Sequence, residues 1–400
     1  MLIGIVGKPS SGKTTILNAL CLTDAKMGDY PFTTIKPNRG MAFVRINCYC
    51  SDLEGDCQPR TGICENGIRF VPIELLDVAG LVPGASEGKG MGNQFLDDLR
   101  QADAFIHVVD ASGQSDAEGN QTTNYDPSED VIWLNSELTS WVSNILFKDW
   151  DKLSRKLDAE RSRTVEAMAD RLSGLGATIN VVKSAMMESN LLEKTPKLWD
   201  DEDKNVFADK IRKLMFPSVI ALNKADKKSS SENITKLKKR FPDETLVNTS
   251  GLAELMLRNA DTAKKIKYTP GSREIEFLGD PTNPDKSLNI IRAIKENILD
   301  ENNTTGVSKL LEVCVFDILK LIAVFPVEDS THLTDQDGRI LPDVYLVPEG
   351  TTAKEFAGKV HTDLQKTFIN GLLVNDNNKR IAATHVMKNR DIIKIIAAQK

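Results

Sequence analysis

The chain opens with a short apolar run that leads directly into a glycine-rich loop. Residues 1–6 suit a buried strand, and they are followed by Gly7-Lys8-Pro9-Ser10-Ser11-Gly12-Lys13-Thr14, which matches G-x-x-x-x-G-K-[ST]. A helix is expected from Thr15 onwards. Backbone N–H groups of such a loop curl around phosphates, and the helix N-terminus adds partial positive charge. The pattern predicts a nucleotide site in which Lys13 reaches the β- and γ-phosphates and Thr14 binds Mg²⁺.

Two further segments are expected to supply Mg²⁺ ligands and a γ-phosphate contact beside this loop. A predicted strand over residues 70–76 ends in Asp77-Val78-Ala79-Gly80. We expect Asp77 to hold Mg²⁺ through a water molecule and the Gly80 N–H to meet a γ-phosphate oxygen. In the upstream segment 30–35, Thr34 is expected to complete the Mg²⁺ shell while the γ-phosphate is present. Loops of this kind order on the triphosphate and relax after hydrolysis.

A third segment predicts which base is bound. The predicted strand 217–222 ends in Asn223-Lys224-Ala225-Asp226, an N-K-x-D sequence. The Asp226 carboxylate matches the N1–H and N2–H₂ donors of guanine, a pair that adenine lacks. We expect Asn223 to hold the loop and the base edge, and the stem of Lys224 to pack over the ring. After the last strand, Ser250-Gly251-Leu252 is expected to present N–H groups to guanine O6.

The order of these motifs predicts the fold and narrows the function. Strands and helices alternate, which is typical of an α/β domain with a parallel sheet and ligand loops at the strand carboxyl ends. D-x-x-G and N-K-x-D sequences serve a switch and no acceptor substrate, so a small-molecule kinase is disfavoured.

The length and composition of the chain limit which kinds of partner it is expected to have. The 400 residues suffice for two or three domains. With 51 Lys and Arg against 57 Asp and Glu, the net charge of −6 gives no whole-chain attraction to nucleic acid. No apolar run approaches the roughly 20 residues that span a bilayer. The N-terminus is expected to be a strand and not a signal peptide, and six cysteines in this length do not form a disulfide scaffold. We expect a cytoplasmic monomer without a membrane partner.

Four of the cysteines fall close together in a turn-rich stretch. Cys48, Cys50, Cys57 and Cys64 could hold a tetrahedral Zn²⁺ as thiolates. Their spacing is not the paired C-x-x-C arrangement that marks a zinc site most strongly. The sequence is compatible with three roles for these cysteines: ligands of a structural metal, unlinked thiols, or a redox-sensitive site.

The region between the second and third motifs predicts a helical insertion. Apolar residues recur at helical spacing from Ile132 to Leu146, and a charged amphipathic helix is expected over 150–175.

From about Phe316 the pattern changes to short strands and turns, with strands expected over 319–326, 343–348 and 390–396 and a helix opened by Thr352. His107 lies within a predicted strand, which favours the role of a satisfied core histidine.

Three segments of the chain carry a family resemblance. These are the run from Asp77 to Ser86, the run Gly88-Lys89-Gly90-Met91-Gly92-Asn93-Gln94-Phe95-Leu96, and residues 30–38. In these segments the chain resembles the Obg-like YchF family of P-loop GTPases and ATPases. The resemblance extends over nearly the whole chain and is closest to the archaeal type. It implies a Ras-like domain with a helical, partly coiled-coil insertion and a C-terminal TGS domain of β-grasp form. It also implies nucleoside-triphosphate hydrolysis and a role at the ribosome, with ribosome or rRNA contacts made by the insertion and the TGS domain. The expected division is 1–127 and 217–313 for the GTPase domain, 128–216 for the insertion and 314–400 for the TGS domain.

Two departures from the family bear on catalysis. Ser10 stands where YchF relatives usually have Asn, which weakens any inference of potassium-assisted catalysis. The stretch 112–127 lacks the histidine of bacterial and eukaryotic relatives, so no catalytic base is assigned. Leu81 occupies the position of the water-orienting Gln of Ras-type enzymes and cannot hydrogen-bond water.

These features predict a Mg²⁺-dependent GTPase with slow intrinsic turnover. Many relatives have a changed N-K-x-D element and prefer ATP, whereas this chain keeps the element intact. An ATP-preferring hydrolase and a nucleotide-gated binding module with negligible hydrolysis are the alternatives.

Overall fold

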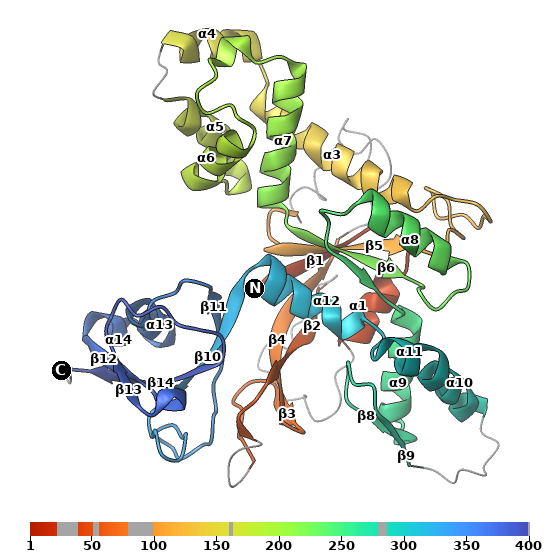
Figure 1. Cartoon of the computed structure of the whole chain (residues 1–400), viewed down its shortest axis with the longest axis vertical. Helices are drawn as coiled ribbons and strands as arrows, with labels where there is room; N and C mark the ends of the chain where they lie inside the picture. The colour runs from red at the N-terminus through yellow and green to blue at the C-terminus, as the bar shows by residue number, and fades with distance from the viewer. Residues whose placement is uncertain (22–38, 51–55, 79–98, 160–162, 279–285, 399–400) are drawn as a thin grey trace. The chain divides into compact units, whose positions relative to one another are not determined.

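The computed structural model describes the chain except residues 22–38, 51–55, 79–98, 160–162, 279–285 and 399–400 (Figure 1). The chain divides into two units, residues 1–19 with 75–307 and residues 20–74 with 308–400. Strand β4 (Ile68–Asp77) passes from the second unit into the first.

The first unit is built on a sheet of parallel strands. Strand β5 pairs in parallel with β1 and β6, and β6 pairs in parallel with β7. All residues of β1 and β5 are buried, as expected for strands covered on both faces. The remaining elements of this part are short or lie on the sheet. The bounds are β1 (Leu2–Val6), α1 (Lys13–Cys21), β5 (Ala104–Asp110), β6 (Ser218–Asn223), α8 (Ser230–Arg240), β7 (Leu246–Asn248), α9 (Gly251–Thr262), β8 (Ile266–Tyr268), β9 (Ile275–Phe277), α10 (Lys286–Ile294) and α11 (Asp300–Asn302).

A helical insertion separates β5 from β6. Figure 1 shows its two longest helices, α3 (Ser128–Leu146) and α7 (Asp201–Met215), lying side by side. Between them come α4 (Trp150–Ala159), α5 (Thr164–Leu172) and α6 (Ile179–Glu188). Stacked rings of Trp150 and Trp199, 5.3 Å apart, are part of the core of this insertion.

The prediction of one continuous helix over 150–175 is wrong. The backbone of Arg163 has φ −118° and ψ 12°, outside the helical region, and α5 starts anew at Thr164. At the other end, Gly176 adopts a left-handed conformation (φ 80°) and terminates the last turn. The apolar spacing predicted the helices correctly, but it carried no signal for the break.

The second unit contains a five-stranded sheet with strand order β11-β10-β14-β12-β13. The central strands β10 and β14 are parallel, and the flanking pairs are antiparallel. Helix α13 begins as predicted at Thr352, whose hydroxyl accepts from Glu355 N while the Glu355 carboxylate accepts from Thr352 N. The bounds are α12 (Val307–Glu312, which starts in the first unit), β10 (Leu321–Val327), β11 (Tyr345–Pro348), α13 (Ala353–Val360), α14 (Thr362–Lys366), β12 (Phe368–Leu373), β13 (Lys379–Ile381) and β14 (Asp391–Ala397).

A hairpin also belongs to this unit. Strands β3 (Ile63–Glu65) and β4 are antiparallel and are joined by Asn66 and Gly67, both with positive φ (50° and 75°). Asn-Gly is the preferred pair for such a two-residue turn. Strand β2 (Arg39–Asn47) lies next to β4 in the sheet order.

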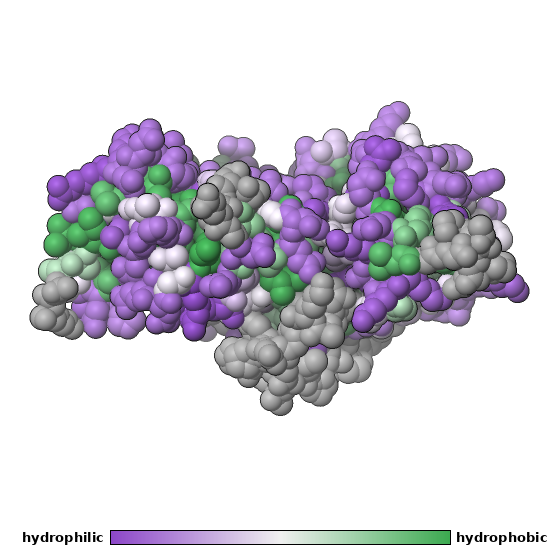
Figure 2. All heavy atoms as spheres, turned by 90° about the horizontal axis from the view of Figure 1, so that it is seen from below, coloured by the Kyte–Doolittle hydropathy of each residue, from purple (hydrophilic) through white to green (hydrophobic). Residues whose placement is uncertain are grey.

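The surface gives no sign of a membrane span. None of the helices described here is both long and apolar enough to cross a bilayer. On the face drawn in Figure 2, hydrophilic residues predominate and hydrophobic residues occur in small groups among them.

His107 corrects one expectation. The residue is buried in β5 as predicted, at 2% exposure, but its Nε2 has no hydrogen-bond partner in the part of the chain that is described. Burial, with a smaller contribution from the charge of Lys13, lowers the pKa of His107 to about 3. The imidazole is therefore neutral in the folded protein at physiological pH.

We predict that His107 makes stability fall in mild acid. Between pH 6.5 and about 3 the unfolded chain binds a proton at this residue that the folded chain does not, so stability is lost as the pH falls. From pH 6.5 to 4.5 the wild type should lose about 2–3 kcal/mol more than His107→Gln, at about 1.4 kcal/mol per pH unit. Urea titrations of both proteins at several pH values measure this difference, and parallel pH profiles would contradict it.

Candidate functional site

The glycine-rich loop joins β1 to α1 at the carboxyl edge of the parallel sheet. Gly7 and Gly12 have φ values of 147° and 98°, which side-chain-bearing residues rarely adopt. A Cβ on Gly7 would lie 2.4 Å from the carbonyl oxygen of Val108, and one on Gly12 would lie 2.2 Å from Asn223 Nδ2. The loop therefore needs glycine at both positions to pack against β5 and β6.

Lys13 is held inside the curl of this loop. Its Nζ donates to the carbonyl oxygens of Gly7 (2.7 Å) and Lys8 (2.8 Å). Burial lowers the pKa of Lys13, and the charge of Asp77 partly offsets this. A half-buried ammonium beside a carboxylate and two carbonyl groups is a cation that a bound phosphate would stabilise further.

Asp77, at the end of β4, is the charged group that interacts with Lys13. Burial raises the pKa of Asp77, and the charge of Lys13 partly offsets the increase. Thr14 follows Lys13 at the start of α1 and is exposed. A carboxylate and a hydroxyl at the rim of the loop are the oxygen ligands that Mg²⁺ prefers. The donor set of the described residues thus fits a magnesium ion.

Asn223 connects three of the predicted motifs. Its side chain is buried, its Nδ2 donates to Ser11 O (3.0 Å), and its Oδ1 accepts from Gly251 N (3.1 Å). One amide thereby ties the glycine-rich loop to the N-K-x-D segment and to the start of α9. The sequence predicted that Asn223 holds a loop, and both of these hydrogen bonds go to backbone atoms.

Lys224 adds a second tie to the same loop. Its Nζ donates to Ser10 O (3.0 Å) and pairs with Asp110 (2.7 Å). Burial acts to raise the pKa of Asp110, but hydrogen bonds from Lys224, Ser112 and Ser115 hold it below its ordinary value. Asp110 is therefore a fixed negative charge beneath the loop.

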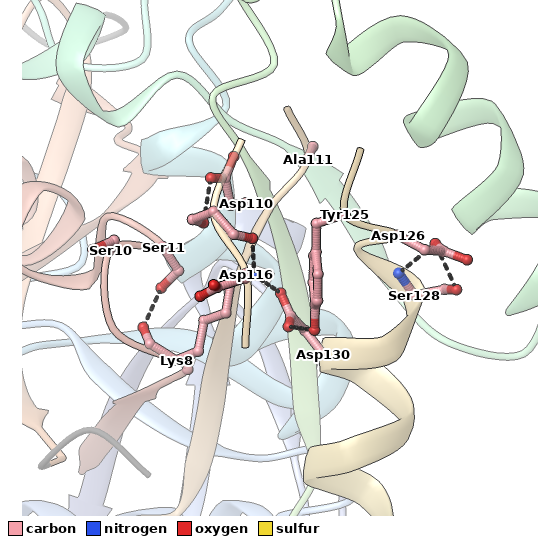
Figure 3. A network of polar contacts seen from close by, with 12 residues as sticks. Lys8, Ser10, Ser11, Asp110, Ala111, Asp116, Tyr125, Asp126, Ser128 and Asp130 are labelled. Atoms are coloured by element: carbon pink, nitrogen blue, oxygen red, sulfur yellow. Dashed lines mark hydrogen bonds and ion pairs between the residues drawn. The ribbon is translucent and has the colours of Figure 1, made fainter. Parts of the chain in front are cut away.

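The side chain of Lys8, which the loop motif does not distinguish from its neighbours, points away from the curl (Figure 3). Lys8 is 1% exposed, and its Nζ pairs with Asp130 (2.9 Å), donates to Ser115 O (2.7 Å) and lies 3.8 Å from the centre of the Tyr125 ring. The Tyr125 hydroxyl donates to Asp130 (2.7 Å). Burial raises the pKa of Asp130, and Lys8 counteracts it. This network fastens residues 115–130 onto the glycine-rich loop. In any phosphate site here, only the backbone of Lys8 is available to the ligand.

Two of the predicted base-selecting residues, Asp226 and Ser250, line one pocket. Asp226 is exposed, which leaves its carboxylate accessible to a ligand. With Ser250 and Thr305 it lines a pocket of about 380 Å³. Ser250 N donates to Thr305 O (2.9 Å), so the segment after α11 supports this loop. Leu252, in the first turn of α9, is 54% exposed.

Some predicted positions are outside the described residues. These are Thr34, Gly80 and Leu81, so their roles stay predictions.

The four clustered cysteines come together in the second unit. Their sulfur atoms all lie within 4.8 Å of one another. Hydrogen bonds from the thiols of Cys57 and Cys64 hold the pKa of Cys48 well below its usual range, and the shared hydrogen bond raises the pKa of Cys57 to about 11. The donor set is compatible with a zinc ion.

A phosphate-type loop clamped to an N-K-x-D segment at the edge of a parallel sheet defines a P-loop nucleotide-binding protein of the GTPase fold. Family models match three stretches, described as 50S ribosome-binding GTPase (residues 2–136), Obg-like GTPase YGR210-like, G4 motif-containing domain (221–329) and TGS domain (331–397).

Relatives match over the full chain. The GTP-binding protein MJ1332 of Methanocaldococcus jannaschii is 45% identical over 401 residues, covering 100% of both chains. The crystal structure of a GTP binding protein from Pyrococcus horikoshii is 35% identical and covers 100% of both chains with a TM-score of 0.77. The ribosome-binding ATPase YchF of Buchnera aphidicola is 27% identical over 93% of this chain and 88% of its own. The chain belongs to the YchF/Obg-like family of P-loop GTPases, as its motifs predicted.

Proposed function

We propose that the protein is a Mg²⁺-dependent switch that binds and hydrolyses GTP and acts with the ribosome. The observation that carries the choice of GTP is the clamp made by Asn223, which joins the phosphate loop to an intact N-K-x-D segment. The clamp leaves the Asp226 carboxylate exposed to accept from guanine. An adenine base would leave this acceptor without its two donors.

Each group of predicted site residues has its own role in binding the nucleotide. The backbone of residues 7–15 would bind the phosphates, and Lys13 would orient the β- and γ-phosphates. Ser250, Gly251 and Leu252 would offer N–H groups to guanine O6, and Lys224 would keep the loop in register with its Ser10 contact. Gly80 would sense the γ-phosphate.

Magnesium would be held by Thr14 and Asp77, with Thr34 as a further ligand in the triphosphate state. When bound, the magnesium ion would neutralise part of the negative charge of the phosphates. The position of Leu81 offers no hydrogen bond to the attacking water, so we propose slow turnover that a partner accelerates.

The ribosome is the partner we propose, through the insertion and the TGS domain. Support comes from the relative named a ribosome-binding ATPase and from the 50S ribosome-binding GTPase family match. The insertion also exposes large apolar side chains that its own core does not cover. Among the described residues they are Ile179 (52% exposed), Met187 (57%), Leu198 (67%), Val206 (40%) and Leu214 (39%). We place the protein in the cytoplasm as a monomer, with the domain division 1–127, 128–216, 217–313 and 314–400.

Single-turnover hydrolysis of GTP and of ATP, with and without ribosomal subunits, tests this function. We expect GTP to be bound at least about 100-fold more tightly than ATP, since two hydrogen bonds to a carboxylate are at stake. Ribosomal subunits should raise the GTP rate. Tighter ATP binding would establish the ATP-preferring alternative, and no hydrolysis of either nucleotide with ribosomes present would leave a binding module.

A further inference from the structure

The cysteine cluster is built from three separate pieces of one hairpin region. Cys48 follows β2, and its N–H donates to Gly67 O (2.7 Å) in the β3–β4 turn. Cys64 lies on β3, while Cys50 and Cys57 lie in the segment between β2 and β3. The sulfur atoms of Cys48 and Cys57 are 3.8 Å apart, and those of Cys50 and Cys64 are 3.4 Å apart. All four cysteines are free thiols.

These separations suit one tetrahedral metal ion. Four sulfur atoms at about 2.3 Å from a shared zinc ion lie about 3.8 Å from one another. A tetrahedral set of four thiolates is typical of Zn²⁺, or of iron in an iron–sulfur site.

A buried arginine beside the cluster points independently to a negatively charged group there. Arg69 is 0% exposed and is the register partner of Cys64 across the β3–β4 hairpin. Its Nη2 donates to Leu341 O (2.5 Å), whereas Nε and Nη1 have no oxygen or nitrogen acceptor in the described structure and the guanidinium interacts with Cys48, Cys57 and Cys64. A buried unpaired cation is costly. Four thiolates around Zn²⁺ carry a net charge of −2, which would compensate the guanidinium.

Residues next to the cysteines contact the C-terminal domain, mainly through the segments that join its strands. Gln58 N donates to Ile340 O (2.8 Å) and Arg60 N donates to Pro342 O (2.9 Å). The Tyr49 hydroxyl donates to Arg390 O (2.8 Å), and its ring packs edge-on against Phe325, 6.0 Å between centres.

The side chain of Arg60 adds charge to the same contact. It pairs with Asp335 (2.5 Å) and with Asp343. Tyr49 lies between two of the cysteines, Gln58 follows a third, and Arg69 faces the fourth. The residues that make these contacts are therefore next to the cysteines, along the chain or across the hairpin.

We propose that Cys48, Cys50, Cys57 and Cys64 bind one structural zinc ion, and that this ion shapes the hairpin that fastens the C-terminal domain to β2 and β4. The ion compensates Arg69 and fixes Tyr49, Gln58 and Arg60 in their contacting positions. Strand β4, the second strand of the metal-held hairpin, continues along the chain to Asp77.

Metal content of the full-length protein, purified under reducing conditions, tests the first half. We expect one zinc per chain by elemental analysis. Cobalt(II) added to the metal-free wild type should give the intense visible bands and thiolate charge-transfer bands of a tetrahedral four-sulfur site. Cys57→Ser and Cys64→Ser should each bind less than half as much zinc, whereas the matched control Cys314→Ala, which alters a buried cysteine outside the cluster, should keep it.

Hydrogen exchange tests the second half. Removing the ion with a chelator should speed exchange of the Gln58 and Arg60 amides at least tenfold, and added zinc should reverse it. Stoichiometric iron, disulfides among the four cysteines, or four freely reactive thiols in protein supplied with zinc would overturn the metal assignment. Unchanged exchange at these two amides on metal removal would overturn the fastening role.

Discussion

Replacing Lys8 by methionine is expected to lower the free energy of unfolding by about 3–5 kcal/mol, because it leaves the buried Asp130 carboxylate without its cation. Lys8 and Asp130 have side-chain exposures of 1% and 3% and lie 2.9 Å apart. Methionine keeps most of the volume over the Tyr125 ring, so the loss reflects charge more than packing. Urea unfolding of the nucleotide-free protein measures the change.

The double variant Lys8→Met/Asp130→Asn separates charge from shape. Asparagine keeps an oxygen for the Tyr125 hydroxyl and removes the uncompensated charge, so the double variant should recover at least half of the loss. Lys236→Met is the matched control. It breaks an exposed pair with Glu232 of similar length (2.6 Å) and should cause no measurable loss. A double variant no more stable than Lys8→Met would contradict the account.

Asn223→Ala is expected to weaken binding of GTP and ATP alike, by at least about tenfold, and to lower stability by about 2–4 kcal/mol. The substitution leaves Ser11 O and Gly251 N buried without their partner, at about 1–3 kcal/mol each. The phosphate loop serves both nucleotides, so the ratio of their affinities should stay unchanged. Calorimetric titration with GDP and ADP, together with urea unfolding, gives both quantities.

Asn233→Ala is the matched control for this variant. The Asn233 amide also donates to a backbone oxygen, that of Ala111, at 3.0 Å, but it does not touch the glycine-rich loop. It should leave nucleotide affinity within about twofold of the wild type. If Asn223→Ala changed the preference between the two purines, Asn223 would have a direct role in base selection that the clamp does not explain.

The phosphate loop and the α/β fold could be predicted because their signals are local. Gly7 and Gly12 are needed for positive φ within one short loop, and the buried strands β1, β5 and β6 are continuous apolar runs. The helix start at Thr352 followed in the same way from a cap and a glutamate three residues later.

Contacts between distant parts of the chain could not be predicted in this way. Lys8 looks like any variable position of the loop pattern, and its partners Ser115, Tyr125 and Asp130 carry no pattern of their own. Arg69 reaches Leu341 across 272 positions of sequence. The spacing of the cysteines suggested a metal only weakly, since it was the folded hairpin that brought the sulfur atoms together.

Base recognition by Asp226 is the central claim, and the variant Asp226→Asn tests it most directly. The Asn oxygen still accepts from N1–H, but its amide would donate toward the guanine N2–H₂ donor, whereas xanthine has a carbonyl oxygen at that position. The test is to measure, by calorimetry, the affinities of the wild type and of Asp226→Asn for GDP, ADP and XDP. The account predicts that the wild type prefers GDP and that the variant binds GDP at least about 30-fold more weakly and prefers XDP. A variant that keeps the wild-type preference for GDP, or a wild type that does not distinguish GDP from ADP, would contradict it.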